Sequence, residues 1–401
     1  MELHFQFGWG MMEHCRALLA AWGGGTAILS PRDLSDAQLR KLADTINRLP
    51  GGSVLLDPQF YLPHADHERL RSHAYWPPNY STGTFWQGAP LRALLRSLRE
   101  LNDVLRSRAF VLPGILTERI DDDWLAIQQA ILTEAVDLQL NRPLIATVAL
   151  GADAVRNSSQ IAELIEASRD WEVQGVYLVA EHPNGAYLVN DPIWLANIVD
   201  LVAAFRLRRL NVTLGYCNHQ MLIAGCVKAT AIASGTWMNV RSFPPDKFRT
   251  AYEEEIKQRT TWYYCPQGLS EYKLPFLDIA QRRGLLAQMV PPTGFSTSYA
   301  SMLFAGGQPS VLAFTEQAAF RHYLECLRTQ TMQAVEPTFD ATVARHESLL
   351  STAEAVLQQL TGAGVRGQMR DFGEMIDVNR AALADLVSTR GPILRRVWAN
   401  L

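Results

Sequence analysis

Acidic and hydroxyl side chains stand at the ends of several short apolar runs in this 401-residue chain. Asp57 ends the run that begins at Ser53, Glu181 ends a run that begins at Gly175, and Ser234 ends a run that begins at Lys228. A carboxylate placed at the end of a buried strand can act as a general base or accept hydrogen bonds from a polar substrate. We therefore take Asp57 and Glu181 as candidate catalytic residues, and Ser234 as a polar residue at the same rim whose catalytic place rests on the family resemblance given below.

Other polar and aromatic residues lie beside the same run ends, where they could contact a substrate. The candidate binding residues are His4, Gln6, Gln59, His182, Asn218, His219, Trp237, Asn239 and Arg241. Some of them have an alternative structural interpretation, since Asn218 could equally cap the helix that follows it. Asp191 precedes a helical segment and is interpreted as its N-cap rather than as a catalytic group.

The sequence gives little indication of a metal or cofactor. One histidine-rich stretch, with His64, Asp66, His67 and His73, has a loose spacing that fits no common metal site. The five cysteines are scattered, and no CxxC pair, P-loop, HExxH or GxSxG motif occurs. We expect no metal and no other cofactor, and we expect Cys265 to serve packing rather than nucleophilic chemistry.

The apolar runs that carry the candidate residues alternate with helical segments. The runs are Leu3–Phe7, Thr26–Ser30, Ser53–Asp57, Ala109–Pro113, Leu144–Leu150, Gly175–Glu181, Asn211–Tyr216 and Lys228–Ser234. Helical periodicity follows each of the first seven, as in Pro192–Arg208, where apolar residues repeat on one face. Eight strand–helix units predict a (β/α)8 TIM barrel, whose substrates bind at the carboxyl ends of the strands. An open doubly wound sheet is the alternative, although its glycine-rich first turn is not matched by Gly8–Gly10.

Two regions exceed a minimal barrel. Residues 58–90 form a long third loop rich in Pro, His, Tyr and Trp, whose aromatic rings could stack on a base or form a core of their own. We expect the barrel to span residues 1–245 and a post-barrel insertion to span 246–313. A C-terminal helical extension spans 314–401, in which Asp340–Leu360 and Gly367–Leu386 predict a helical hairpin.

The composition excludes several classes of protein. Hydrophobic residues make up 48% of the chain and charged residues 19%, which argues against disorder. The net charge of −3 argues against non-specific nucleic-acid binding. Neither a secretory signal nor an apolar run of membrane-spanning length is recognisable, so we expect a cytoplasmic protein without a membrane partner.

The order of these features resembles the tRNA-guanine transglycosylase family over roughly residues 1–245. In that family an early strand is followed by Asp-Ser-Gly-Gly-Phe-Gln, and here Asp57-Pro58-Gln59-Phe60-Tyr61 occupies a comparable place and keeps the Asp. The family layout also continues through Leu214–Tyr216, Lys228–Gly235 and Arg241. Ser234 falls where the family has its nucleophilic Asp, and the family's cysteine-rich zinc site is missing, because only Cys265 lies in that region.

The resemblance implies a pocket for a guanine or 7-deazaguanine base, free or attached to a macromolecule. The chain looks most similar to divergent relatives from antiphage operons of the CBASS kind. Those operons would supply a protein partner, either a nucleotidyltransferase or a deazaguanine-synthesis-like enzyme, and a homodimer is also compatible with the resemblance. Two alternatives stay open: an active glycosidic, base-exchange enzyme on RNA or DNA that uses Asp57 or Glu181, and a non-catalytic interaction protein.

Overall fold

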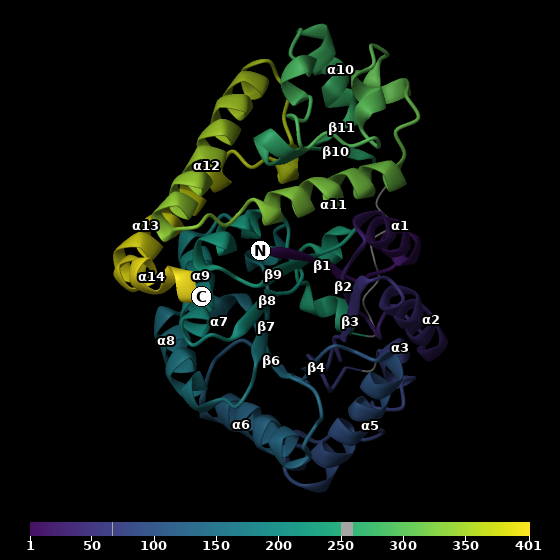
Figure 1. Ribbon diagram of the computed structural model, residues 1–401, viewed down its shortest axis with the longest axis vertical. Helices are drawn as coiled ribbons and strands as arrows, with labels where there is room; N and C mark the ends of the chain where they lie inside the picture. The colour runs from purple at the N-terminus through teal and green to yellow at the C-terminus, as the bar shows by residue number, and fades with distance from the viewer. Residues whose placement is uncertain (66, 250–259) are drawn as a thin grey trace.

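Eight parallel strands form a nearly closed barrel in the computed structural model, which describes residues 1–65, 67–249 and 260–401 (Figure 1). They are β1 (Glu2–Gln6), β2 (Gly24–Leu29), β3 (Gly51–Leu56), β4 (Phe110–Val111), β6 (Leu144–Leu150), β7 (Gly175–Ala180), β8 (Asn211–Leu214) and β9 (Ala231–Ser234). Each matches one of the predicted apolar runs, and the expected TIM barrel is confirmed.

The strand order shows how the barrel closes. Neighbours run β3-β2-β1-β9-β8-β7-β6-β4, so the first and last barrel strands lie side by side, with Phe5 opposite Ser234. The remaining seam lies between β3 and β4, where the amide of Arg108 donates to the carbonyl of Val54 at 3.0 Å. The short strand β5 (Leu116–Thr117) pairs with the end of β6. The carboxyl ends of all the barrel strands therefore face one way.

Helices surround the barrel as their apolar stripes predict. They are α1 (Met12–Trp22), α2 (Asp36–Asn47), α5 (Ala89–Leu105), α6 (Asp122–Asp137), α7 (Ala152–Arg156), α8 (Ser158–Ala167) and α9 (Pro192–Leu207). In α5, the buried Leu91, Leu94, Leu95 and Leu98 follow the i, i+3, i+4, i+7 spacing of one helix face. Asp191 caps α9 by accepting from the amides of the second and third helical residues, at 3.1 and 3.0 Å, which confirms its expected role.

The long third loop builds a small core of its own. It contains α3 (Glu68–Arg71) and α4 (Thr82–Phe85). The ring of Phe60 lies 4.9 Å from Trp76, 5.8 Å from Phe85 and 5.9 Å from Trp86, measured between ring centroids. These buried rings pack on each other, so they form a small hydrophobic core within the loop.

The last two connections of the barrel depart from the repeating pattern. The segment after β8 is a 3-10 helix, η3 (His219–Val227), where an α-helix was expected. In the described residues only short 3-10 turns, and no α-helix, directly follow β9, and α11 (Glu316–Met332) instead packs against β1 and α1. Figure 1 shows α11 lying across this side of the barrel, in the place that an eighth barrel helix would occupy. The predicted C-terminal extension, residues 314–401, therefore begins with a helix, α11, that covers the barrel.

The remaining elements form a second layer. They are the antiparallel hairpin β10 (Trp262–Cys265) and β11 (Ser270–Lys273), α10 (Leu274–Arg282), α12 (Phe339–Gly362), α13 (Met375–Thr389) and α14 (Gly391–Val397). Short 3-10 turns are η1 (Ser168–Asp170), η2 (Pro183–Gly185), η4 (Met238–Val240), η5 (Pro245–Phe248), η6 (Pro266–Gly268), η7 (Leu286–Met289), η8 (Ser301–Phe304), η9 (Pro309–Val311), η10 (Gln368–Arg370) and η11 (Trp398–Asn400). The expected hairpin of α12 and α13 is present, although α13 begins at Met375 and not at Gly367 as expected. α13 covers the outer face of α9, which explains why α9 is buried on nearly all sides.

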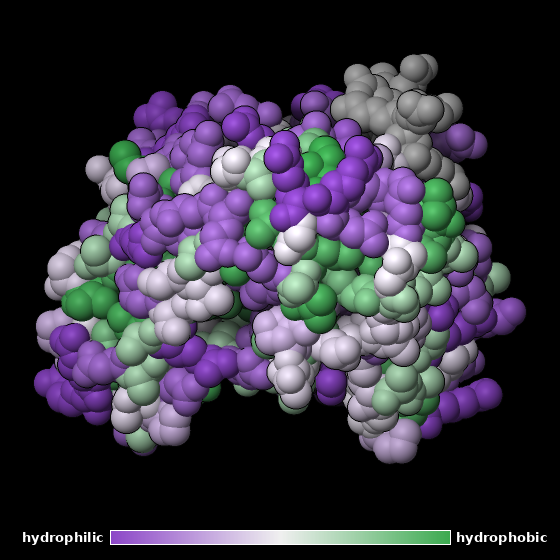
Figure 2. All heavy atoms as spheres, turned by 90° about the horizontal axis from the view of Figure 1, so that it is seen from above, coloured by the Kyte–Doolittle hydropathy of each residue, from purple (hydrophilic) through white to green (hydrophobic). Residues whose placement is uncertain are grey.

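The surface of the molecule mixes hydrophilic and hydrophobic areas. In the view from above, hydrophobic side chains occur in small areas between hydrophilic ones (Figure 2). Among the residues that the structure describes, no helix combines the length and apolar character needed to cross a bilayer.

Candidate functional site

The carboxyl group of Asp57 lies at the centre of a buried polar cluster at the carboxyl end of the barrel. Asp57 directly follows β3 and is fully buried. The hydroxyl of Tyr61 donates to both carboxylate oxygens, at 2.9 and 2.8 Å, and the hydroxyl of Tyr216 donates to Oδ2 at 3.0 Å. The backbone amide of Gln59 donates to Oδ1 at 2.9 Å. The protein thus supplies three hydrogen-bond donors to the carboxylate, which has about four acceptor sites.

Burial and hydrogen bonding act on Asp57 in opposite directions. Loss of solvation favours the neutral acid and raises the pKa of Asp57 to about 6. The bonds from Tyr61, Gln59 and Tyr216, together with the positive charge of Lys247, work against this and keep the shift moderate. A carboxyl group with a pKa near 6 is mostly ionised at neutral pH and can still exchange a proton close to it.

Two glutamines extend the cluster across the barrel. Gln6, at the end of β1, accepts from the hydroxyl of Tyr177 at 2.8 Å, and this hydroxyl also lies 3.4 Å from Asp57 Oδ2. Gln59 Nε2 donates to the Tyr216 hydroxyl at 3.1 Å. The Nε2 atom of Gln6 is buried and has no hydrogen-bond partner within the described ranges. Of the predicted residues, Asp57, Gln6 and Gln59 therefore do converge on one place.

Aromatic rings and a lysine cover this cluster. Phe243 packs edge-on against Tyr61, with centroids 5.0 Å apart, and Phe248 packs against the same ring at 5.0 Å. The ammonium group of Lys247 lies 4.0 Å from the centroid of the Tyr216 ring and donates to the carbonyl of Asn239 at 2.7 Å. Residues just past the barrel therefore seal the carboxyl end of its interior, and Asn239 contributes its backbone to the seal.

Glu181 lies beside this cover rather than inside the cluster. Its backbone pairs with that of Phe243, and its half-buried carboxylate accepts from the amide of Ala152 at 3.3 Å. Burial raises the pKa of Glu181, the Ala152 amide partly offsets this, and the charge of Glu118 raises it further. His182 follows, buried against Trp194 with its Nδ1 2.9 Å from the carbonyl of Ala186, so it is held by structural contacts.

Arg241 belongs to a buried ion-pair network that joins the barrel to the C-terminal layer. Its guanidinium lies 3.2 Å from Glu271, and Glu271 also binds Arg370 at 2.7 Å. Burial disfavours the charged carboxylate, but Arg370 and Arg241 outweigh this and lower the pKa of Glu271 to about 2. The ring of Tyr323 stacks on the Arg241 guanidinium at 3.5 Å. Arg241 is thus engaged by the protein itself and not directed at a ligand.

Three other predicted residues lie near this network. Asn218 caps η3 through Gln220 and donates to the carbonyl of Arg241 at 3.3 Å, which supports the capping interpretation. His219 is buried among aromatic rings, and burial lowers its pKa to about 4. Ser234 is buried close to Tyr323, and in the described part of the chain no group forms a hydrogen bond with its Oγ.

His4 and Trp237 complete the set. His4 is fully buried and binds Glu2, the first residue of β1, at 2.9 Å, with Arg108 at 3.5 Å. Both partners lie at the amino ends of strands, so the expected position of His4 at the substrate rim is corrected to the opposite end of the barrel. Trp237 is half-buried against Phe320 at the carboxyl rim.

Trp9 is an exposed aromatic residue at the same rim that sequence reasoning missed. It is 59% exposed, on the loop after β1, and its ring lies 6.4 Å from that of Trp237. Gly8 allows this loop to sit close to η4, because a side chain there would meet Val240 at 2.7 Å. A hollow of about 40 Å³ between Thr236 and the Arg241 network opens nearby, which is room for about one water molecule, whose share of liquid volume is about 30 Å³.

Two of the three histidines of the third loop have partners other than a metal, while the buried Nδ1 of His67 has no hydrogen-bond partner among the described residues. His73 lies 2.6 Å from Asp36, and His64 bonds Thr82 at 2.8 Å, while Asp66 lies outside the described residues. In the C-terminal layer, His322 beside Cys326 bonds Thr297 and the carbonyl of Tyr264. Nowhere in residues 1–65, 67–249 and 260–401 do three or more His, Cys, Asp or Glu side chains form a group suited to a metal ion.

The tyrosines of the Asp57 cluster were also missed. Tyr177 interrupts the aliphatic run of β7, and Tyr216 lies two residues beyond the end of β8. A buried tyrosine usually places its hydroxyl on a polar partner, so a tyrosine within a barrel strand was the available signal.

Comparison with known proteins does not assign the chain to a family: no protein-family model matches it, and no curated protein matches it.

Proposed function

We propose that the barrel is a transglycosylase-like protein that recognises a guanine or 7-deazaguanine base, free or attached to a macromolecule, at the carboxyl end of its strands. The observation that supports this most is the buried Asp57 carboxylate with its ring of hydroxyl and amide groups. Polar groups at this end of a TIM barrel are where substrates of such folds bind. The resemblance to the transglycosylase family, which keeps an Asp in this place, supports the same base class.

The chemistry of Asp57 suits the polar edge of such a base. A guanine-type ring presents a ring N–H and an exocyclic amino group side by side, and a carboxylate accepts both. These donors would replace the bonds from Tyr61 and Tyr216. The unpartnered Nε2 of Gln6 would donate to the adjacent ring carbonyl, because Tyr177 holds Gln6 and Asp57 next to each other.

Access to Asp57 requires a local rearrangement. Phe243, Lys247 and Phe248 cover the cluster, so a base reaches the carboxylate only when this segment is displaced. The displaced rings would then be available to stack on the base. Binding would accordingly be slower than a diffusion-limited encounter.

The proposal is recognition rather than base exchange. A serine attacks a sugar carbon only when a neighbouring base takes its proton, and the neighbour of Ser234 is the hydroxyl of Tyr323, whose pKa is raised by burial so that it stays protonated. The second candidate is glycosidic chemistry by Glu181, whose half-buried carboxyl has a raised pKa, as a general acid requires. Release of labelled guanine from RNA or DNA, abolished by Glu181→Gln, would favour that second candidate.

Calorimetric titration tests the proposal directly. We expect 7-deazaguanine to bind the intact protein at pH 7.5 and adenine, which lacks the paired donor edge, to bind at least about tenfold more weakly, the equivalent of one hydrogen bond. Asp57→Asn should weaken the binding of 7-deazaguanine by a similar or larger factor. Asp191→Asn, which changes the α9 cap of the same barrel, is the matched control and should leave binding unchanged. Equal binding of both bases, or no binding of either, would refute the proposal.

A further inference from the structure

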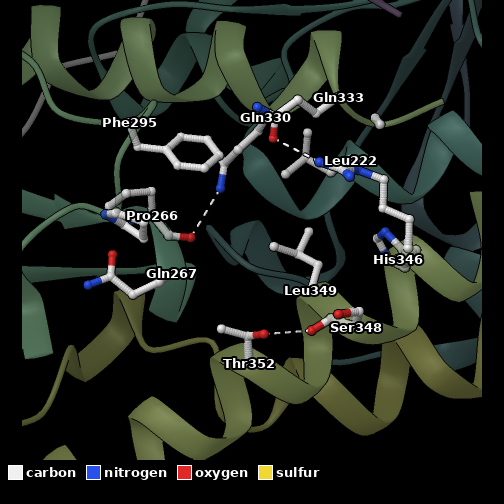
Figure 3. Close-up of a pocket in the computed structure, with 13 residues that line it drawn as sticks. Leu222, Pro266, Gln267, Phe295, Gln330, Gln333, His346, Ser348, Leu349 and Thr352 are labelled. Carbon is white, nitrogen blue, oxygen red and sulfur yellow. Dashed lines mark hydrogen bonds between the residues drawn. The ribbon is translucent and has the colours of Figure 1, made fainter. Parts of the chain in front are cut away.

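A cavity of about 220 Å³ lies in the C-terminal layer, away from the Asp57 cluster. It is bounded by α11, α12, η3 and the turn of the β10–β11 hairpin. Figure 3 shows Leu222, Phe295 and Leu349 pointing toward a common space, with Gln267 and His346 at opposite ends of it. The cavity therefore has an apolar middle and two polar ends.

Most polar groups of the wall are already engaged with each other. Gln330 accepts from the Tyr264 hydroxyl at 2.9 Å and donates to the carbonyl of Pro266 at 3.1 Å. Arg345 pairs with Glu336 at 3.2 Å and donates to Gln333 at 2.8 Å. These contacts hold the side chains of the wall in place. The formal charge that the wall carries, on Arg345, is neutralised by Glu336.

The two ends of the cavity keep unused hydrogen-bonding capacity. His346 is 7% exposed, and the side chain of Asn379 beside it acts to raise its pKa, but neither His346 Nε2 nor Asn379 Oδ1 has a partner in good hydrogen-bond geometry among the described residues. Burial lowers the pKa of His346 to about 4, so its ring is neutral at physiological pH. Gln267 gives its Nε2 to the carbonyls of Gln288 and Val290, while its buried Oε1 lacks a partner among the residues described.

We propose that this cavity is a binding site for an uncharged small molecule that has one aromatic ring and a polar amide-like group. The ring would lie between Phe295 and Leu349, and the polar group would bond the free atom of Gln267 or His346. The size agrees, since an engineered apolar cavity of about 150 Å³ holds benzene, and the additional volume accommodates a substituent. This inference does not depend on the proposed base recognition, because no residue of the Asp57 cluster takes part.

Ligand-detected NMR on the full-length protein tests the site with three probes of the same shape. Benzamide is the neutral probe, and benzoate and benzylamine carry a negative and a positive charge. We expect saturable binding of benzamide and at least about tenfold weaker binding of both ions, because a charge would be moved from water into an uncharged cavity. Equal binding of the three probes, or no binding of benzamide, would overturn the inference; the latter is the result for a cavity that holds only ordered water.

Variants on α12 locate the binding. Thr352 is exposed but lines the cavity, so Thr352→Phe should fill it and reduce benzamide affinity at least tenfold without disturbing the fold. Ala344→Phe, at an exposed position of the same helix that does not line the cavity, is the matched control. The double substitution Gln267→Leu with His346→Leu, which removes both free atoms, should weaken the binding of benzamide about tenfold and leave that of toluene unaffected. Benzamide binding that survives both Thr352→Phe and Ser348→Phe would place the ligand elsewhere and refute the assignment.

Discussion

The carboxyl group of Asp57 is buried, and no salt bridge to it is found in the described part of the chain, so burial dominates how it responds to pH. Its pKa is about 6 in the folded protein and 3.8 in an unfolded chain. Between these values the folded state binds more protons than the unfolded state, so the contribution of Asp57 to stability falls as the pH rises from about 4 to about 6. A salt-bridged carboxylate such as Glu271, with its pKa lowered from 4.5 to about 2, acts in the opposite sense and loses its stabilising effect as the pH falls from about 4.5 to about 2.

Asp57→Asn should therefore change stability in a pH-dependent way. The difference between a pKa of about 6 and one of 3.8 corresponds to about 3 kcal/mol, since a tenfold change in proton affinity is about 1.4 kcal/mol. Relative to the native protein, the free energy of unfolding of Asp57→Asn should rise by roughly this amount between pH 4 and pH 7.5. Urea unfolding at four pH values in this range measures the difference. A difference that stays constant with pH would show that Asp57 does not have a raised pKa.

Glu271→Gln should be among the most destabilising single substitutions in the chain. It removes the carboxylate that both Arg241 and Arg370 bind and leaves two guanidinium groups uncompensated, one of them fully buried. We expect a loss of about 3–5 kcal/mol in the free energy of unfolding. Arg169→Gln, which breaks an exposed pair with Glu166, should cost less than about 1 kcal/mol. Similar losses for the two variants in urea unfolding would contradict this ranking.

At the scale of elements, local sequence patterns were sufficient to predict most strands and helices of the barrel. They were insufficient for the connections after β8 and β9. Apolar runs and helical periodicity depend on near neighbours, and they placed all eight strands. The run that begins at Lys228 is an instructive error, because Lys228 has a positive φ of 50° at the end of η3 and the strand starts only at Ala231. Which helix covers β1 depends on a contact between residues about 300 positions apart, and no local pattern encodes it.

The position of α11 predicts that the C-terminal region cannot be removed from the barrel. A chain that ends at residue 313 would lack α11 and α13 and expose the faces of β1 and α9 that they cover. We expect this fragment to be digested rapidly by protease and to unfold without a cooperative transition. A fragment that resists protease and unfolds cooperatively would show that the barrel is independent of the extension.

A single residue of α11 gives a milder version of the same test. Leu327 is fully buried in that helix, and Leu327→Ala should cost about 2–5 kcal/mol. Val104→Ala, at a position 44% exposed on α5, should change the free energy of unfolding by less than about 1 kcal/mol. Thermal or urea unfolding of the two variants side by side provides the measurement.

At the scale of the whole molecule, the barrel brings together candidate site residues that the sequence could identify only one at a time. Asp57, Gln6 and Gln59 were found because polar residues at strand ends stand out against apolar runs. Tyr177 and Lys247 were missed, since a tyrosine in a strand resembles core and a lysine beyond the barrel resembles surface. Polar type alone also could not distinguish Gln6 from His4, whose side chain lies toward the other end of the same barrel.

The central claim is that Asp57 receives the donor edge of a guanine-type base at the carboxyl end of the barrel. A crystal structure of the protein with 7-deazaguanine tests it most directly. The account predicts ring and amino nitrogens about 3 Å from the two carboxylate oxygens, in place of the Tyr61 and Tyr216 hydroxyls, with Phe243 and Phe248 displaced. A base bound elsewhere, for instance against Trp9, with the Asp57 cluster unchanged, would contradict it.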